Sequence, residues 1–433
     1  MIDIKRIREN PEALAERLNT RCGNDGDKLK ELLELDEKRR SALTESEQLK
    51  AKRNKESKAI GTLVGQGKKD EAEAKKAEVR AFGERINELD EAAGQAEAAR
   101  DQILLSIPNP PHESVPAGAS EEDNPELRKW GEAKNYDFEP KNHIELCEQL
   151  GLIDFKRGAK LSGSGFLLYM GWGARLERAL AQFLLDLHTS EHGYTEVSPP
   201  YIVGRDCMVG VGQFPKFEDQ AYAVQEGLDD STMGALYLLP TAEAPVANIH
   251  REEILTEEEL PKYYCAFSPC FRAEAGAAGV GTRGMIRVHQ FEKVELIKIV
   301  PPGEGYEELE KMTADAERVL QLLDLHYRVI LLCAGDMGFA SAKTYDIEVW
   351  APGQGSYLEV SSCSNCEDYQ PRRMNLRYKT GKENRFPHLL NGSGTALARL
   401  FVALIETHQQ ADGSIAIPAP LQPYLKADRI PAL

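Results

Sequence analysis

The sequence predicts an α+β protein in which an arm of two antiparallel helices precedes a core that contains a β-sheet. The arm is predicted from two long charged segments, about residues 27–60 and 70–105, in which apolar residues recur in alternating three- and four-residue steps. A proline-rich connector follows, and the remaining chain mixes strand-like apolar runs with amphipathic helices.

Length and composition restrict the possible functions. The chain has 433 residues, which is enough for a large core and more than one domain. Its net charge of −17 argues against indiscriminate binding of nucleic acid, so an RNA partner must meet a local basic patch. No run of 18 or more apolar residues is present, so no membrane span is expected. Eight cysteines in so long a chain, without a signal peptide, favour the reducing cytoplasm.

The predicted helices of the arm have seams of different quality. A short helix is expected to start at Asn10-Pro11, a cap residue followed by proline. In the second long segment only Arg100 interrupts the seam formed by Val79, Phe82, Ile86, Leu89, Ala93, Ala96 and Ile103. In the first segment Arg39, Ser46, Arg53 and Glu56 interrupt the seam formed by Leu32, Leu35, Ala42, Leu49, Ile60 and Leu63.

Positive charge is concentrated where the two helices would meet. Ten basic residues lie between positions 50 and 80: Lys50, Lys52, Arg53, Lys55, Lys58, Lys68, Lys69, Lys75, Lys76 and Arg80. Five acidic residues lie among them: Glu56, Asp70, Glu71, Glu73 and Glu78. This excess predicts contact with a phosphate backbone, and the alternative is an ordinary solvated coiled coil.

The connector sets the expected domain boundary. Residues 106–136 and the chain just beyond contain six prolines among acidic residues and glycines. We therefore expect one domain at residues 1–110 and a second at residues 111–433.

The stretch from Phe271 to Glu295 is predicted to form a β-hairpin with a glycine-rich loop. Arg272 and Glu274 share a face of its first strand, because alternate residues of a strand point the same way. In the second strand, expected from about Val288 to Val300, the same parity aligns Arg287, Phe291 and Glu295. A cation, an aromatic ring and an anion in a row suit a phosphate, a flat base and an ammonium group; the alternative is a solvated sheet face.

This hairpin resembles motif 2 of the class II aminoacyl-tRNA synthetases, in FRAE followed after a loop by RVHQF. Its continuation, HQFEKVE, is similar to the version found in bacterial-type seryl-tRNA synthetases, and the resemblance extends over most of the chain. It implies a class II catalytic domain on a mainly antiparallel sheet flanked by helices. It also implies that the helical arm grips the long variable arm of the tRNA.

Two further stretches resemble class II motifs. The helix expected at residues 176–188, followed by HGYTEVSPPYIV, resembles motif 1, which implies a homodimer. Residues 390–402, a small-residue turn that runs into an apolar helix, resemble motif 3, whose arginine is Arg399. Ala396 and Ala398 depart from the general motif 3, which has more glycines and an acidic residue before the arginine.

The resemblance assigns roles to residues at matching positions. As catalytic residues it implies Arg272, Glu274 and Arg399. For ATP binding it implies Arg272, Ala273, Glu274, Arg287, Val288, Phe291, Glu359, Val360, Ser361, Ser362 and Arg399. For serine binding it implies Thr241, Ala242, Glu243, Glu295 and Ser393. The residues themselves also allow a purely structural role for Thr241 as a helix N-cap.

Two short patterns raise the question of metal binding. A carboxylate and a hydroxyl three residues apart, Glu359 and Ser362, can both supply oxygen to Mg²⁺, and the resemblance places the magnesium that accompanies ATP there. Cys363 and Cys366 form a lone CxxC. Structural zinc needs four ligands, and no second pair of cysteines or histidines occurs nearby, so zinc is not favoured.

The resemblance implies ATP-dependent activation of L-serine to seryl-adenylate and its transfer to tRNA(Ser), with tRNA(Sec) as a further acceptor. Two other functions remain open. A synthetase-like ligase that loads an amino acid onto a carrier protein would be expected to lack the basic arm. A non-catalytic RNA-binding protein would tolerate loss of Arg272, Glu274, Phe291 or Arg399, all of which are present.

Overall fold

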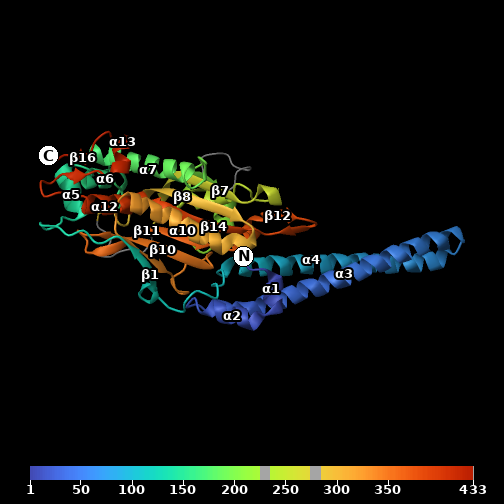
Figure 1. Ribbon diagram of the computed structural model, residues 1–433. Helices are drawn as coiled ribbons and strands as arrows, with labels where there is room; N and C mark the ends of the chain where they lie inside the picture. Colours follow the sequence, from blue (N-terminus) through green and yellow to red (C-terminus); the bar gives the residue numbers. More distant parts are fainter. Residues whose placement is uncertain (225–234, 274–283, 433) are drawn as a thin grey trace. The chain divides into compact units, whose positions relative to one another are not determined.

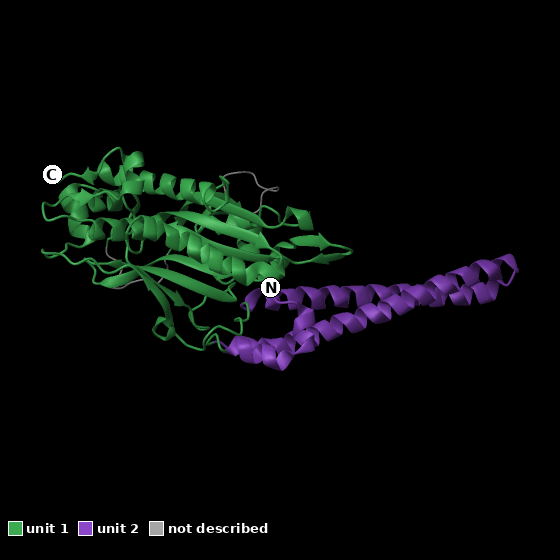
Figure 2. Cartoon of the chain, viewed as in Figure 1, with its two compact units in different colours: residues 1, 20–22, 109–433 green, residues 2–19, 23–108 purple. Residues whose placement is uncertain are grey.

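The computed structural model describes residues 1–224, 235–273 and 284–432 (Figure 1). It divides into two compact units (Figure 2). Residues 2–19 and 23–108 form the helical unit, and residues 1, 20–22 and 109–433 form the core unit.

The helical unit contains a long antiparallel hairpin of two helices, as predicted (Figure 1). Its helices are α1 (Ile4–Glu9), α2 (Pro11–Asn19), α3 (Lys28–Gly65) and α4 (Lys69–Ser106), with a 3₁₀ turn at Asp25–Asp27. The predicted start of α2 is confirmed: Pro11 is its first residue, and the backbone N–H of Ala13 donates to Asn10 Oδ1 at 3.3 Å.

The hairpin tolerates a broken seam because three of the four polar interruptions have partners on the opposite helix. Buried seam residues include Leu32, Ala42, Ile86, Leu89, Ala93 and Ala96. Three of the interrupting side chains contact the opposite helix: Arg39 pairs with Glu97 (3.0 Å), Ser46 donates to Asp90 (2.6 Å), and Glu56 pairs with Lys75. These three interruptions are therefore cross-helix contacts that also fix the register of the hairpin.

Arg100, which interrupts the second seam, forms part of a buried ion-pair cluster. Its Nη1 lies 3.6 Å from Oδ1 of Asp36, whose other oxygen lies 3.6 Å from Nε of Arg8. The Asp36 side chain is only 4% exposed. Because a buried carboxylate is stable only when it is paired, Arg100 is required where the seam pattern would place an apolar residue.

In the core unit, eight strands form one sheet in the order β1-β9-β10-β11-β14-β8-β7-β2. Every neighbouring pair is antiparallel except β2 and β7, so the predicted mainly antiparallel sheet is confirmed. The strands are β1 (Glu126–Trp130), β9 (Tyr327–Leu331), β10 (Lys343–Ala351), β11 (Ser356–Asn365), β14 (His388–Ala396), β8 (Gln290–Val300), β7 (Lys262–Phe271) and β2 (Thr195–Glu196).

Three helices, α7 (Trp172–Ser190), α10 (Gly305–Leu322) and α12 (Leu397–Thr407), pack on one face of this sheet. Alternation along β10 separates the two faces, since Tyr345 and Ile347 belong to the core under the helices while Thr344 lies on the opposite face. That opposite face carries polar side chains, and the site described below lies on it.

Shorter elements complete the core unit. The helices are α5 (His143–Leu150), α6 (Phe155–Ser162), α8 (Arg205–Val211), α9 (Glu243–Ala247), α11 (Tyr369–Met374) and α13 (Gln422–Leu425). The strands of the small sheets are β3 (Ile202–Gly204), β4 (Ala223–Val224), β5 (Leu236–Leu238), β6 (Ile254–Thr256), β12 (Arg377–Thr380), β13 (Glu383–Arg385), β15 (Ile415–Ala416) and β16 (Arg429–Ile430).

Local expectations differ from the structure in two places. The small residues before Arg399 were expected to form a turn, but they form strand β14, because pairing with β8 and β11 satisfies their backbone groups. The proline-rich connector includes β1, which pairs with β9 at the sheet edge. The connector is also anchored, since Asn109 Nδ2 donates to the carbonyls of Ala340 and Cys366, both at 2.9 Å.

Arg21 stabilises a loop that reaches the site. Its guanidinium donates to the carbonyls of Asn109 (2.8 Å), Met337 (2.8 Å), Gly338 (2.6 Å) and Ser341 (3.0 Å). Four hydrogen bonds from one planar group restrict the loop of residues 337–341, which lines the cavity described below.

Among the described residues, no helix combines the length and the apolar character that crossing a bilayer requires.

Replacing Arg100 with alanine should destabilise the helical unit by about 3 kcal/mol, because Asp36 would stay buried with one partner fewer. Urea denaturation followed by far-ultraviolet circular dichroism measures the change. Arg80→Ala is the control: its side chain is 83% exposed, so loss of its pair with Glu84 should cost less than about 0.5 kcal/mol. Equal effects of the two substitutions would contradict the buried-cluster interpretation.

Candidate functional site

A cavity of about 480 Å³ lies on the polar face of the large sheet. Residues from β8, β11 and β14, from the start of α9 and from the 337–341 loop line it. Among the lining residues are eight predicted site residues: Thr241, Glu243, Arg272, Arg287, Glu295, Glu359, Ser362 and Ser393. The structure thus brings together side chains that lie up to 152 residues apart in the sequence.

Thr241, Lys293 and Glu295 form a hydrogen-bonded cluster at the inner end of this cavity. Thr241 Oγ1 donates to Glu295 Oε2 at 2.7 Å, and Lys293 Nζ lies 2.5 Å from the same carboxylate oxygen. Lys293 also donates to Thr241 Oγ1 at 3.0 Å. All three residues are buried, so Lys293 is the opposite charge that pairs with the buried carboxylate of Glu295.

Glu243, at the first position of α9, is held differently. Its Oε1 accepts hydrogen bonds from the amides of Gln370 (2.6 Å) and Asn391 (3.0 Å), and its backbone N–H donates to Thr241 Oγ1 at 3.2 Å. Burial, together with the nearby negative charge of Glu295, raises the pKa of Glu243 to about 7. Since Lys293 is engaged by Glu295, Glu243 is the carboxylate in this cavity that most lacks a cation.

Arginines supply positive charge toward the opening. Arg272 is exposed, its Nε donates to the Pro240 carbonyl at 3.3 Å, and its guanidinium lies 5.1 Å from the centre of the Phe291 ring. Arg287 lines the same cavity but precedes β8, which begins at Gln290, so strand parity does not explain its position.

Arg399, at the start of α12, borders the cavity through Glu359. Its Nη1 donates to the Glu359 carbonyl at 2.9 Å and lies 3.2 Å from Oε2 of the same residue. Its Nε donates to the Ile286 carbonyl at 3.1 Å. These contacts tie the helix start to β11 and to the segment that follows the predicted glycine-rich loop.

The Glu359 and Ser362 region fits a hard divalent cation. Asp346 on β10 is the cross-strand neighbour of Ser362, and its Oδ1 is buried without a hydrogen-bond partner among the described residues. Burial and the charge of Glu359 raise the pKa of Asp346 well above its ordinary value. Glu359, Ser362 and Asp346 provide oxygen atoms, which Mg²⁺ prefers. Among the described residues, no group of three or more His, Cys, Asp or Glu side chains is placed to hold a metal ion.

The remaining predicted residues lie beside the cavity or outside the described residues. Ala242, Val288, Val360 and Ser361 are buried, and Ser361 Oγ donates to the Ser393 carbonyl at 2.5 Å. The backbone N–H of Ala273 donates to the Gln220 carbonyl at 3.1 Å. Glu274 lies outside the described residues.

Sequence reasoning missed four polar residues of the site: Lys293, Asp346, Gln370 and Asn391. Strand alternation could have predicted Lys293, since it lies between Phe291 and Glu295 on the same strand face. Asn391 lies two residues before Ser393 on β14 and shares its face. Nothing local in the sequence distinguishes Gln370, because its contact with Glu243 depends on how α11 packs.

The cysteine pair lies in the interior. Cys363 and Cys366 are buried free thiols, and burial raises the pKa of Cys363 to about 12. Cys366 lines the cavity and accepts a hydrogen bond from Asn391 Nδ2 at 3.4 Å. A buried neutral thiol there acts as a small apolar wall.

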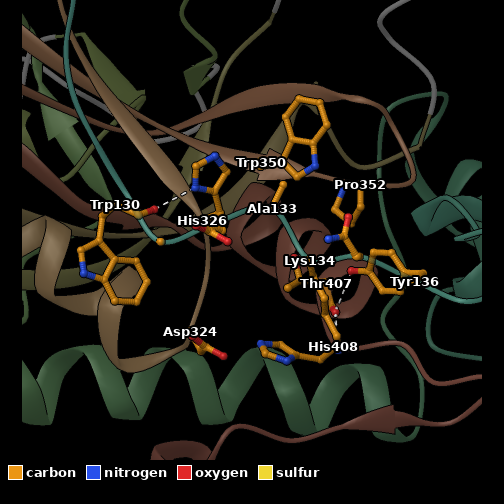
Figure 3. A pocket seen from close by; sticks show the side chains of 13 residues that line it. Trp130, Ala133, Lys134, Tyr136, Asp324, His326, Trp350, Pro352, Thr407 and His408 are labelled. Carbon is orange, nitrogen blue, oxygen red and sulfur yellow. Dashed lines mark hydrogen bonds between the residues drawn. The ribbon is translucent and has the colours of Figure 1, made fainter.

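A second cavity, of about 370 Å³, lies beneath the strap of residues 130–136 (Figure 3). Its polar groups bind one another: His326 Nδ1 lies 2.8 Å from the Trp130 carbonyl, and the Tyr136 hydroxyl donates to the Thr407 carbonyl at 2.9 Å. These contacts hold the strap against the end of the sheet, and the cavity contains none of the predicted site residues.

Comparisons with known proteins agree with this geometry. Residues 1–111 match the family model described as the seryl-tRNA synthetase N-terminal domain, and residues 222–408 match the tRNA synthetase class II core domain (G, H, P, S and T). The chain is 53% identical over 432 residues to the serine–tRNA ligase of Carboxydothermus hydrogenoformans, and 54% identical over 431 residues to that of Akkermansia muciniphila. Each alignment covers 99% of both chains.

Solved structures show the same similarity. The crystal structure of seryl-tRNA synthetase from Pyrococcus horikoshii complexed with ATP superimposes with a TM-score of 0.93 at 38% identity, covering 100% of both chains.

The raised pKa of Glu243 predicts that this carboxylate opposes folding at neutral pH and above. The folded state holds the proton up to about pH 7, against an ordinary value of 4.5, so stability is lost as pH rises through this window. Glu243→Gln should therefore match the wild type near pH 5 and be more stable by roughly 1–2 kcal/mol at pH 8. Denaturant titrations at both values test this, with the exposed Glu258→Gln as control; no pH-dependent gain would contradict it.

Proposed function

This chain belongs to the seryl-tRNA synthetase family of class II enzymes, and from that premise we propose how its cavity joins L-serine to tRNA(Ser) with ATP. The observation that carries the assignment is the polarity of the cavity. Its inner end holds two carboxylates, Glu243 and Glu295, and its opening holds Arg272 and Arg287. An ammonium group suits the first end and a polyphosphate suits the second.

Serine occupies the inner end in this proposal. Its ammonium lies against Glu243 and Glu295, and its hydroxyl lies among Thr241, Ser393 and the neighbouring backbone of Ala242. A pocket that hydrogen-bonds a substrate hydroxyl rejects the analogue that lacks it, here alanine, by roughly 10⁴-fold in favourable cases. Threonine must be excluded by the size of the pocket.

ATP occupies the opening. Arg272 binds the α-phosphate, Arg287 and Arg399 bind the outer phosphates, and Phe291 stacks on the adenine. The Glu274 carboxylate accepts a hydrogen bond from the adenine amino group, and the backbone of Ala273, Val288, Val360 and Ser361 completes the contacts. The present contact of Arg272 with the Phe291 ring, at 5.1 Å, supports a shared binding surface for base and phosphate.

We propose that Glu359 and Ser362 hold Mg²⁺ with the nucleotide, with Asp346 behind them. When bound, the ion neutralises charge on the outer phosphates. The unpartnered oxygen of Asp346 supports this location.

The reaction requires positioning more than a protein base. The serine carboxylate oxygen attacks the α-phosphorus in line, the bond to the bridging oxygen breaks, and pyrophosphate leaves with the electron pair. A ribose hydroxyl of the tRNA 3′ end then attacks the seryl carbonyl, and AMP leaves. Arg272 remains on the α-phosphate in both steps and stabilises the charge that develops there.

The tip of the helical hairpin is proposed to bind the tRNA backbone. Lys52, Lys55, Lys58 and Lys69 are exposed and make no salt bridge within the part of the chain that the structure describes. Charges without local partners remain available to phosphates, and displacement of counterions from the RNA would contribute to affinity.

We also propose a homodimer that forms through α7 and β2, because these elements correspond to the stretch resembling motif 1. A role in the cytoplasm and service to tRNA(Sec) belong to the same proposal. The eight free cysteines support a reducing compartment.

ATP–pyrophosphate exchange with each of the twenty amino acids, followed by charging of tRNA(Ser), tests the function directly. Serine alone should support strong exchange, and only tRNA with a long variable arm should be charged. Exchange with another amino acid in preference to serine would overturn the substrate assignment.

Glu295→Ala should lower kcat/KM for serine in the exchange assay by at least about 100-fold, because it removes a charged contact and leaves Lys293 buried without its counterion. Glu307→Ala, at an exposed position of α10, is the matched control and should keep normal activity. Retention of serine activation by folded Glu295→Ala would refute the role of this carboxylate.

Reversing charge at the tip of the helical hairpin should impair transfer of serine to tRNA without impairing activation of serine. With Lys52, Lys55, Lys58 and Lys69 changed to glutamate, KM for tRNA(Ser) should rise by roughly 10-fold or more. The rate of serine-dependent ATP–pyrophosphate exchange should stay unchanged. The same reversal at Lys30, Lys38 and Arg40, near the base of the hairpin, serves as control. An unchanged tRNA KM in the tip variant would place the RNA elsewhere.

A further inference from the structure

Gln370, on α11, is a fully buried amide directly behind the serine end of the cavity. Its Nε2 donates one hydrogen bond to Glu243 Oε1 at 2.6 Å and another to the Val211 carbonyl at 3.0 Å. Its Oε1 is buried and has no partner among the described residues. The side chain therefore satisfies both of its hydrogen-bond donors and leaves its acceptor unpaired.

This orientation of the amide is fixed by its surroundings. Turning the amide over would place Oε1 against a carboxylate and a carbonyl, both of which only accept hydrogen bonds. An unpaired buried oxygen is unfavourable for stability, so its presence at this position indicates a requirement other than packing.

The requirement comes from the surroundings of Glu243. Lys293 is engaged by Glu295 at 2.5 Å, so the direct side-chain partners of the Glu243 carboxylate are the neutral amides of Gln370 and Asn391. Of these two, Gln370 makes the shorter hydrogen bond. It also links Glu243 to the end of α8, where Val211 lines the same cavity.

We propose that Gln370 is a positioning residue for the amino-acid substrate: its amide aims the Glu243 carboxylate into the cavity and holds it in the form that receives the serine ammonium. The inference rests on the proposed function and deepens it. Gln370 touches neither ATP nor the reacting atoms, so its loss should affect serine binding and leave nucleotide binding intact.

Two nearly isosteric variants test this in the full-length protein. Gln370→Met removes both hydrogen bonds and keeps the volume, and Gln370→Glu replaces a donor with a second carboxyl group beside Glu243. ATP–pyrophosphate exchange should show kcat/KM for serine lowered by roughly 10- to 100-fold in Gln370→Met, mainly through KM, with KM for ATP within about 2-fold of wild type. Gln370→Glu should be the more defective of the two at pH 8.

The pH profile provides a readout that a purely structural role would not change. Glu243 faces Glu295 and Lys293 on β8, Arg272 after β7 and Cys366 after β11. The hydrogen bond from Gln370 lowers the pKa of Glu243 against the effects of burial and Glu295. Its removal should therefore shift the acid limb of kcat/KM for serine to higher pH in Gln370→Met.

Gln321→Met is the matched control, since Gln321 on α10 also donates through Nε2, to the Tyr327 hydroxyl at 2.9 Å, away from this cavity. It should leave both the serine KM and the acid limb unchanged. Folded Gln370→Met with an unchanged serine KM and acid limb would overturn the inference. Failure of both Gln370 variants to fold while Gln321→Met folds would also overturn it, in favour of a structural role.

The outcomes distinguish this inference from the proposed function. If the wild type shows no serine-dependent exchange, the proposed function itself fails. If the wild type activates serine and the Gln370 variants match it, only the inference about Gln370 fails.

Discussion

Two carboxylates, the buried Glu295 and the half-buried Glu243, share one buried cation, and the rest of the site depends on this imbalance. Glu295 takes the Lys293 ammonium at 2.5 Å, whereas Glu243 is held by neutral amides and has its pKa raised to about 7. In the proposed function, a substrate ammonium supplies the missing charge, so binding relieves an unfavourable arrangement that folding alone leaves in place. On this proposal, the site recognises an amino acid because the cavity lacks a cation that the substrate ammonium provides.

The large sheet makes this arrangement possible by separating its two faces. Helices α7, α10 and α12 bury one face in an apolar core, which provides the stability needed to hold charged groups on the other. Because antiparallel pairing fixes the register, Ser393 stands beside Glu295, and Asp346 stands beside Ser362. Positions distant in sequence are thereby set at fixed separations across neighbouring strands, where the proposed binding sites for substrate and nucleotide meet.

Much of this was predictable from local patterns, and the rest required tertiary contacts. The seam predicted the helical hairpin. The β-hairpin motif singled out Arg272 and Glu295, which line one cavity, and Phe291, whose ring lies 5.1 Å from the Arg272 guanidinium. Lys293 lies on the same strand face as Phe291 and Glu295, so strand alternation could have predicted it as well. The prediction of a turn before Arg399 was wrong, because β-pairing with distant strands outweighs the flexibility of the small residues there. Gln370 and Asp346 matter only through packing and cross-strand register, which no local pattern reports.

Serine binding measured by titration calorimetry at pH 7, in buffers of different ionisation enthalpy, tests the central claim most directly. If the ammonium supplies the charge that Glu243 lacks, binding should drive ionisation of a carboxyl with a pKa of about 7 and release roughly half a proton. This release should fade as the pH is raised well above 7. Binding at pH 7 without any proton release would contradict the account.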